Sequence, residues 1–245
     1  MENKVRLIKK KYKALFFDLD NTLWDFNRNA YFALRENYFR FLDNTSEQVF
    51  DHFYSVYMKN NDKLWDAYRK KAIGKKELTR KRFQDTFDEF GITGVDPDEF
   101  NDSYLNIMPG QKHLIENARE VLDYLFPKYK LFIITNGFRE VQFKKLENSG
   151  LMHYFSKIFI SEDIKAPKPN PEIFNYAISS ANARKSESLM IGDDWEVDVM
   201  GAYNIGIDQV YLNREASPGQ LTFNQKNNKP VTYQISHLIQ LVALL

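Results

Sequence analysis

The chain has 245 residues, 43% of them hydrophobic and 27% charged, which is the balance of a globular protein with one large domain or two modest ones. Its formal net charge of +1 creates no overall field that would favour nucleic acid or an anionic membrane surface. The chain has no cysteine, which excludes disulfides, thiolate catalysis and zinc held by cysteine.

The N-terminal residues 1–13 are basic, but no apolar core of a signal peptide follows them. No window of the sequence approaches the roughly 18 apolar residues of a membrane-spanning helix. We therefore expect a cytoplasmic protein that binds neither membranes nor nucleic acid polymers.

The first predicted strand is the apolar run Ala14 to Phe17, which is short and continuous, as in a fully buried parallel strand. Two aspartates one residue apart, Asp18 and Asp20, follow it. In an open α/β sheet, the carboxyl ends of the strands border the crevice in which ligands bind. Two carboxylates there repel each other unless a proton or a cation lies between them. Mg²⁺ suits a site with few carboxylates and a substrate phosphate.

The alternatives for this acidic pair are an ordinary acidic loop and a calcium loop. A calcium loop that begins at Asp18 fits poorly, because its required glycine falls on Leu23 and its terminal glutamate on Asn29. Perturbed carboxylate pairs cluster at functional sites, so we interpret the pair as catalytic.

Between Asn27 and about Phe100 the chain is polar, and its aromatic and aliphatic residues recur at helical spacing. A break at Gly91 to Pro97 precedes one more predicted helix at 98–107. The stretch from Lys59 to Arg82 has ten Lys/Arg against three acids. A solvated helix face is the ordinary explanation of such a stretch, and attraction of anionic substrates is the alternative. The aromatic residues are expected to be mostly core, although one or two could stack on a nucleobase.

From Met108 onward, strand-like and helix-like stretches alternate, which predicts parallel strands joined by crossover helices. The expected fold is α/β: a doubly wound parallel sheet, with the helical unit inserted after the first strand. The predicted domains are a core of residues 1–23 and 109–245 and an inserted helical domain of residues 24–108. Ser217 to Pro230 is predicted to be an exposed loop. The predicted strands are 130–134, 157–161, 188–191, 209–212 and 232–235, and the predicted helices are 138–149, 171–181 and 198–204.

Polar residues also follow two later parts of the predicted sheet. Thr135 and Asn136 end the second strand and offer a hydroxyl and a backbone N–H to an anion, although Thr-Asn-Gly is also an ordinary turn. Lys168 lies between two prolines that restrict its backbone, ahead of a helix that Asn170 caps and Pro171 begins. A lysine held rigidly near carboxylates can bind a phosphate oxygen.

The predicted strand at 188–191 repeats the design of the first, because an apolar run again ends in acids. Gly192 lets the backbone approach closely, and Asp193 is expected to face the same crevice as Asp18. Asp198 could hold either Lys168 or a metal-bound water. Acids in a first helical turn commonly serve only the helix dipole, and the role of Asp194 stays open.

In this order the motifs resemble those of the haloacid dehalogenase (HAD) superfamily of phosphohydrolases. The matching residues are Asp18-Leu19-Asp20-Asn21-Thr22, Thr135, Lys168, and Gly192-Asp193-Asp194 with Asp198. The resemblance extends from Tyr12 to about Leu212 and implies a HAD-like, Rossmann-type core. The inserted helical unit is similar to the C1 cap of that superfamily. Within the superfamily, the chain is most similar to the small-molecule phosphatases that include pyrimidine 5′-nucleotidases of the YjjG type.

The resemblance implies a role for each matching residue. Asp18 would be the nucleophile and a metal ligand. Asp20 would be the general acid and base, with its backbone carbonyl on the metal. Asp193 would complete the Mg²⁺ site, and Asp198 would act from behind these ligands. Thr135, Asn136 and Lys168 would bind the phosphoryl group.

The predicted activity is therefore Mg²⁺-dependent hydrolysis of a small phosphate monoester, through an aspartyl phosphate, with a nucleoside 5′-monophosphate as the expected substrate. A 2-haloacid dehalogenase would need neither a proton for its halide nor Mg²⁺, so Asp20 and Asp193 argue against it. A sugar-phosphate phosphatase or phosphotransferase, and a non-catalytic interaction protein on the same fold, are the remaining alternatives. We expect a monomer or homodimer.

Overall fold

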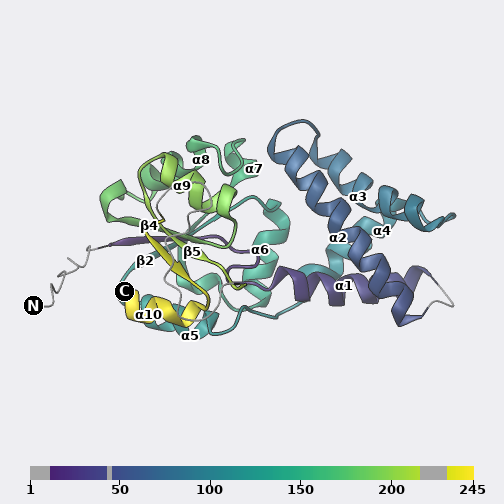
Figure 1. The fold of residues 1–245 in the computed structure, drawn as a ribbon, viewed down its shortest axis with the longest axis horizontal. Helices are drawn as coiled ribbons and strands as arrows, with labels where there is room; N and C mark the ends of the chain where they lie inside the picture. The colour runs from purple at the N-terminus through teal and green to yellow at the C-terminus, as the bar shows by residue number, and fades with distance from the viewer. Residues whose placement is uncertain (1–11, 43–45, 216–230) are drawn as a thin grey trace, which may run out of the picture. The chain divides into compact units, whose positions relative to one another are not determined.

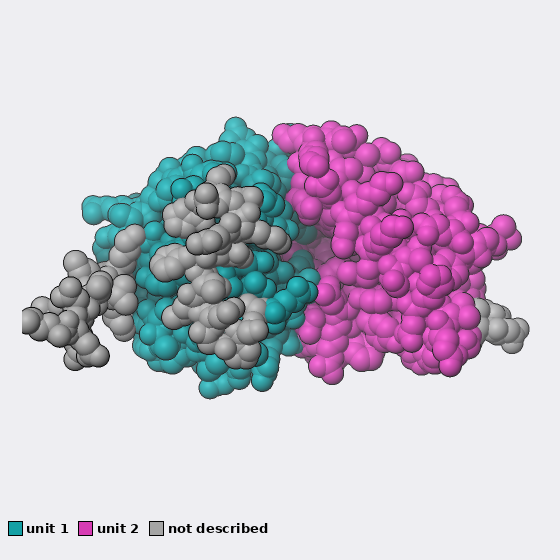
Figure 2. Space-filling model, viewed as in Figure 1, with its two compact units in different colours: residues 1–23, 114–137, 153–245 teal, residues 24–113, 138–152 magenta. Residues whose placement is uncertain are grey.

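The computed structural model describes residues 12–42, 46–215 and 231–245. It divides into two compact units, coloured separately in Figure 2. The sheet unit comprises residues 1–23, 114–137 and 153–245, and the helical unit comprises residues 24–113 and 138–152. The predicted domain boundaries, with residues 24–108 as the insertion, stay a prediction. The loop predicted at Ser217–Pro230 lies outside the described residues.

The described part of the sheet unit has one sheet of six parallel strands in the order β3-β2-β1-β4-β5-β6. The chain adds β2 and β3 on one side of β1 and then β4, β5 and β6 on the other. The strand order therefore reverses between β1 and β4, where a doubly wound sheet binds its ligands. The predicted fold class is confirmed. The strands are β1 (Ala14–Phe17), β2 (Lys130–Thr135), β3 (Phe155–Ile160), β4 (Ser188–Gly192), β5 (Asp208–Leu212) and β6 (Tyr233–Ile235).

The central strand β1 is buried along its whole length, as its apolar sequence predicts. On one face, Phe16 stacks on Phe132 with ring centroids 5.0 Å apart, in a cluster that includes Phe174. Figure 1 shows α8 (Pro171–Ser180) and α9 (Met200–Asn204) on one side of the sheet, with α5 (Ala118–Leu125) and α10 (Leu241–Leu244) on the other. Because helices cover both faces, a ligand can reach the sheet at the carboxyl ends of its strands.

The helical unit is built from α1 (Phe26–Phe41), α2 (Glu47–Arg69), α3 (Lys75–Phe90), α4 (Pro97–Ile107) and α6 (Arg139–Asn148). Its caps follow the sequence: the side chains of Asp25, Ser46 and Asp96 accept hydrogen bonds from the first turns of α1, α2 and α4. Gly91 ends α3 in the left-handed conformation, φ 62°. The predicted helical insertion is therefore present. No helix among the described residues is both long and apolar enough to cross a membrane.

Two predicted elements differ from the structure by two or more residues at an end. β3 begins at Phe155 rather than Lys157, because a bulge beside Leu131 and Phe132 of β2 lets the strand pair earlier. It ends at Ile160, since Ser161 begins the short helix α7 (Ser161–Ile164). The helix predicted at 198–204 begins earlier, as a π-helical turn at Trp195–Val199 that leads into α9.

Candidate active site

The first aspartate of the opening motif lies where the strand order of the sheet reverses. Asp18 follows β1 directly, and its backbone N–H donates to the carbonyl of Ile191 in β4 at 2.9 Å. This bond extends the pairing of β1 with β4 by one residue and so fixes the backbone that carries the carboxylate. Asp18 is only 7% exposed, so its charge is poorly hydrated.

A buried lysine neutralises part of this charge. Lys168 is 1% exposed, and its Nζ lies 2.6 Å from Oδ1 of Asp18 and 2.6 Å from Oδ1 of Asp198. Asn136 fixes the loop that carries the lysine: its side-chain oxygen accepts from the Lys168 N–H at 2.8 Å, and its amide nitrogen donates to the Lys168 carbonyl at 3.0 Å. The sequence pointed to the backbone N–H of Asn136, and no pattern in the sequence indicates this role of its side chain.

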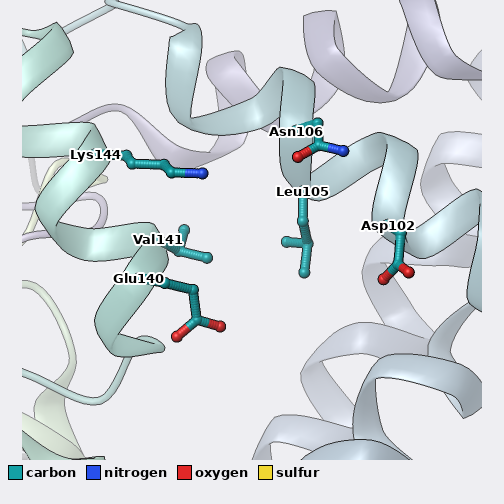
Figure 3. A pocket seen from close by; sticks show the side chains of 6 residues that line it. All are labelled: Asp102, Leu105, Asn106, Glu140, Val141 and Lys144. Carbon is teal, nitrogen blue, oxygen red and sulfur yellow. The ribbon is translucent and has the colours of Figure 1, made fainter.

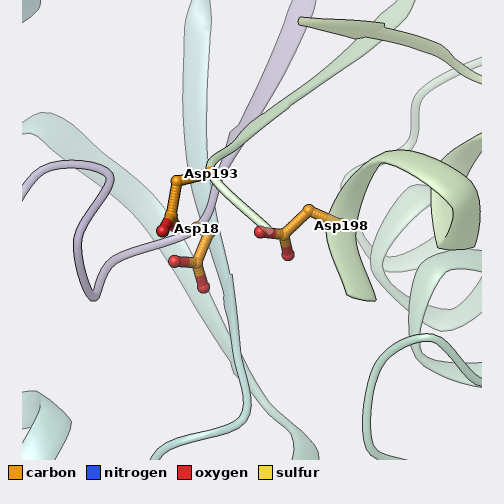
Figure 4. A group of neighbouring side chains, drawn as sticks. All are labelled: Asp18, Asp193 and Asp198. Atoms are coloured by element: carbon orange, nitrogen blue, oxygen red, sulfur yellow. The ribbon is translucent and has the colours of Figure 1, made fainter. Parts of the chain in front are cut away.

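Two further carboxylates, Asp193 and Asp198, follow β4 (Figure 4). One oxygen each of Asp18, Asp193 and Asp198 lies within 4.8 Å of the other two. The hydroxyl of Thr22 donates to Asp193 at 2.9 Å and orients its carboxylate. Glycine is required at position 192, because a Cβ there would lie 2.3 Å from Oδ2 of Asp198. The three aspartates at 18, 193 and 198 and the lysine at 168, all predicted from the sequence, thus form one cluster.

Burial raises the pKa of each of the three carboxyls, because a nearly dry site disfavours the charged form. The pKa of Asp18 is raised to about 7 by burial, which the charge of Lys168 opposes and the charges of Asp198 and Asp20 reinforce. Burial and the charge of Asp18 raise the pKa of Asp193 to about 7. The pKa of Asp198 is raised to about 6 by burial, against the effect of Lys168.

Lys168 itself stays charged. Burial acts to lower its pKa, but the charges and hydrogen bonds of Asp18 and Asp198 outweigh burial and raise the pKa above its usual value. One lysine therefore faces three carboxylates. The cluster has an excess of negative charge that a further cation would relieve.

Three other residues from the predicted motifs lie around this cluster. Thr135 ends β2, and its Oγ1 accepts from the N–H of Gly137 at 3.2 Å. Asp20 is partly exposed, and its charge is close enough to raise the pKa of Asp18. Asp194 caps the π-helical turn, since its Oδ1 accepts from the N–H groups that follow it at positions 196 and 197, at 3.0 and 2.9 Å. This contact gives Asp194 the capping role that the sequence left open.

The helical unit has a pocket of its own, of about 290 Å³, between α4 and α6 (Figure 3). Leu105 and Val141 form its apolar part, and Glu140 at its rim is already paired with Lys75 at 3.0 Å. No site residue predicted from the sequence lines this pocket. The full lining consists of Asp102, Leu105, Asn106, Glu140, Val141 and Lys144.

A doubly wound sheet whose reversal point holds this acid and lysine cluster is the arrangement of one hydrolase class. A family model described as haloacid dehalogenase-like hydrolase matches residues 12–206. The chain belongs to this family, and the match confirms the resemblance stated from the motifs.

Individual relatives show which members of this family the chain is similar to. The pyrimidine 5′-nucleotidase PynA of Streptococcus pneumoniae is 34% identical over 82% of this chain and 84% of its own length. The pyrimidine 5′-nucleotidase YjjG of Escherichia coli is 32% identical over 83% of this chain and 87% of its own length. The solved structure of the HAD-hydrolase YfnB of Bacillus subtilis, described as bound to magnesium, has a TM-score of 0.84 and 28% identity and covers 96% of this chain and 99% of that one. The family match and the two nucleotidases identify the chain as a phosphatase.

Proposed function

We propose that the protein is a Mg²⁺-dependent phosphomonoester hydrolase that acts through an aspartyl phosphate on a nucleoside 5′-monophosphate. One observation carries this proposal: the carboxylate of Asp18 lies at the reversal point of the sheet, 2.6 Å from the Nζ of Lys168. A carboxylate held beside a fixed cation, in a nearly dry site, is a nucleophile next to a group that can bind the electrophile.

The donor set fits a hard divalent cation, because it consists of carboxylate oxygens that carry excess negative charge. Asp18, Asp193 and the backbone carbonyl of Asp20 are the residues that would hold Mg²⁺. Asp198 has a different role, since its Oδ1 accepts from Lys168 and its Oδ2 accepts from the N–H of Asp194 at 3.3 Å. When bound, Mg²⁺ would supply positive charge to the phosphoryl oxygens and to the ionised Asp18. The magnesium named for the YfnB structure supports this assignment.

In the first step, an oxygen of Asp18 attacks phosphorus while the bond from phosphorus to the ester oxygen breaks. Asp20 gives its proton to the departing oxygen, which leaves as an alcohol. Lys168 and the hydroxyl of Thr135 bind the phosphoryl oxygens, and Asn136 keeps the lysine loop in place. The product of this step is phosphate bound covalently to Asp18.

In the second step, water attacks the same phosphorus atom and the bond to Asp18 breaks. Asp20, now ionised, takes the proton from the water. Inorganic phosphate leaves, and both aspartates return to their starting states. The carboxylate of Asp198 holds the ammonium group of Lys168 through both steps, and the carboxylate of Asp18 contacts it again once phosphate has left.

The proposal of a nucleotide substrate rests on the two nucleotidases, which match more than four fifths of the chain. Aromatic residues of the helical unit are the candidates for contact with a base. The role of that unit as a C1-type cap belongs to the same proposal.

The test is phosphate release from nucleoside monophosphates, sugar phosphates and phosphoglycolate, with Mg²⁺ and with a chelator, and with Asp18→Asn as the control. We expect metal-dependent release concentrated on pyrimidine monophosphates. Release only from sugar phosphates would keep the mechanism and reject the nucleotide. Absence of release from every ester, or halide release from a 2-haloacid, would reject the phosphatase mechanism.

A further inference from the structure

Inside the helical unit lies a buried cation that the proposed chemistry does not use. Arg82 of α3 is 3% exposed. Its Nε and Nη2 donate to the same acceptor, Oδ1 of Asn101 in α4, at 3.2 and 2.5 Å. Its Cζ lies 5.4 Å from the ring centroid of Tyr104. A guanidinium has five N–H donors, so one amide oxygen satisfies it only in part.

Within the described part of the chain, no carboxylate forms an ion pair with Arg82. Its neighbours in the sequence differ in this respect: Lys81 lies 3.2 Å from Asp85, and Arg80 is paired with Asp98. Those two cations are partly exposed and paired, whereas the buried Arg82 has no counter-charge among the described residues. A guanidinium stays charged at every ordinary pH, and a buried charge is costly unless it is paired.

Two hydroxyls near Arg82, Oη of Tyr57 and Oη of Tyr104, have no hydrogen-bond partner among the described residues other than each other. Both tyrosines are buried, at 0% exposure. Their ring centroids are 6.0 Å apart. Such unsatisfied buried groups are rare in folded proteins and call for a partner.

The chemistry of these groups is that of an anion site. Burial, with the adjacent Tyr57, raises the pKa of Tyr104 well above its usual value, so its phenol keeps its proton and can donate. The Tyr57 hydroxyl is a second donor, and the free N–H groups of the guanidinium are further donors. Side chains of α2, α3 and α4 thus bring two hydroxyls and one full positive charge together among aromatic rings.

We infer that Arg82, Tyr57 and Tyr104 form a binding site for a small oxyanion, a phosphate or a carboxylate, inside the helical unit. The occupant supplies the counter-charge that the described residues do not give Arg82, and it accepts from both tyrosines. Burial of all three side chains limits the occupant to a compact group. The site is separate from the Asp18 cluster and does not depend on the proposed reaction.

The direct test is NMR of the full-length chain carrying ¹⁵N-labelled arginine, with the Arg82 Nε–Hε signal assigned by its loss in Arg82→Met. Titration with inorganic phosphate, or with acetate, is expected to shift this signal saturably. The double variant Tyr57→Phe/Tyr104→Phe is expected to fold normally and to lose the shift. The matched control is Tyr54→Phe, on the same helix, whose hydroxyl is already bonded to the carbonyl of Asn27 at 2.8 Å. This control is expected to retain the shift.

A third arm identifies the source of the anion. In Asp18→Asn, titration with 3-phosphoglycerate offers a carboxylate beside a phosphate ester that is not turned over. Saturation by phosphate or acetate alone assigns the site to a free anion, and saturation only by the ester assigns it to a small phosphorylated carboxylate. An Arg82 signal that stays unchanged with all three probes, or that shifts equally in the double variant, overturns the inference. Each readout is independent of catalytic turnover, so a failed activity assay leaves it interpretable.

Discussion

Three cations are buried among the described residues, Arg82, Lys145 and Lys168, and two of them, Lys168 and Arg82, have opposite surroundings. Lys168 in the sheet unit has two carboxylate oxygens at 2.6 Å, whereas Arg82 in the helical unit has one neutral amide oxygen and two aromatic rings. Both side chains are at most 3% exposed. Lys168 therefore lies among more negative charges than it can neutralise, whereas no carboxylate of the described residues is paired with Arg82.

This difference shows what each region needs from outside the chain. The Lys168 region is negative overall and fits a cation, and the Arg82 region is positive overall and fits an anion. A buried charge is therefore informative mainly through its partners. The following predictions alter the partners of one cation and compare the result with the other.

The largest expected effect is that of Asp18→Asn, which removes one carboxylate from Lys168 and leaves Arg82 untouched. We expect turnover to fall on the order of 10⁴-fold or more, as when a nucleophile is removed from other enzymes. The fold should persist, because the variant also relieves repulsion among the acids. Phosphate release and circular dichroism measure the two effects. Asp194→Asn, which changes a helix cap, is the control that should keep most of the activity, and normal turnover in Asp18→Asn would refute the nucleophile assignment.

Removing each cation in turn tests the comparison directly. Lys168→Met leaves buried carboxylates without their partner and should lower the free energy of unfolding by about 3–5 kcal/mol. Arg82→Met, in phosphate-free buffer, leaves only the neutral Asn101 without a donor and should cost about 1–2 kcal/mol. Urea unfolding of the two variants gives both numbers. Equal losses would show that Arg82 is compensated as fully as Lys168.

Gly192→Ala alters the partners of Lys168 without changing a charge. The added Cβ would meet Asp198, whose carboxylate must then move away from the lysine. We expect a loss of about 1–3 kcal/mol in the free energy of unfolding, typical of overpacking, together with reduced activity. Gly110→Ala is the matched control, because nothing lies within 4 Å of a Cβ at that position. Comparable stability and activity of the two alanine variants would contradict the close approach of Gly192 to Asp198.

A further expected effect is a pH dependence of stability that arises in the Lys168 region. The pKa values of Asp18 and Asp193 rise from 3.8 to about 7 on folding, so the folded protein binds these protons more tightly than the unfolded chain. In a chelator, stability should therefore fall as pH rises from about 4 to about 7. Melting temperatures across this range measure the slope, and Asp193→Asn should flatten it. A slope that is the same in the variant would exclude Asp193 as its source.

The acid and lysine cluster could be predicted from sequence because its residues stand at strand ends. Two short apolar runs each end in an aspartate, at Asp18 and Asp193, and parallel strands bring such ends to one edge of the sheet. The cap at Asn170 was predictable for a similar reason, since it depends on local residues only, and its side chain accepts from the N–H of Glu172 as expected. Patterns that act over a few residues are visible in a sequence.

The burial of Arg82 was not predicted, and the expectation of a solvated basic face is wrong for this residue. Several cations of the run do lie at the surface beside acids, as Lys70 does with Asp66. Arg82, however, follows the buried Leu78 by four residues and so lies on the same face of α3. That spacing was a usable signal, but the run of charges around it obscured it. The hydrogen bonds between the Asn136 side chain and the Lys168 backbone could not be predicted, because the two residues are distant in the sequence.

The position of β1 in the sheet has a consequence for synthesis. Its two neighbours begin at Lys130 and Ser188, so this fully buried strand leaves the ribosome long before either partner exists. Helices α1 to α4 are made in the interval and can form from local contacts. Until β4 has been synthesised, the apolar side chains of β1 stay exposed, and exposed apolar side chains make a nascent chain prone to aggregation. The insertion that follows β1 therefore sets how long that exposure lasts.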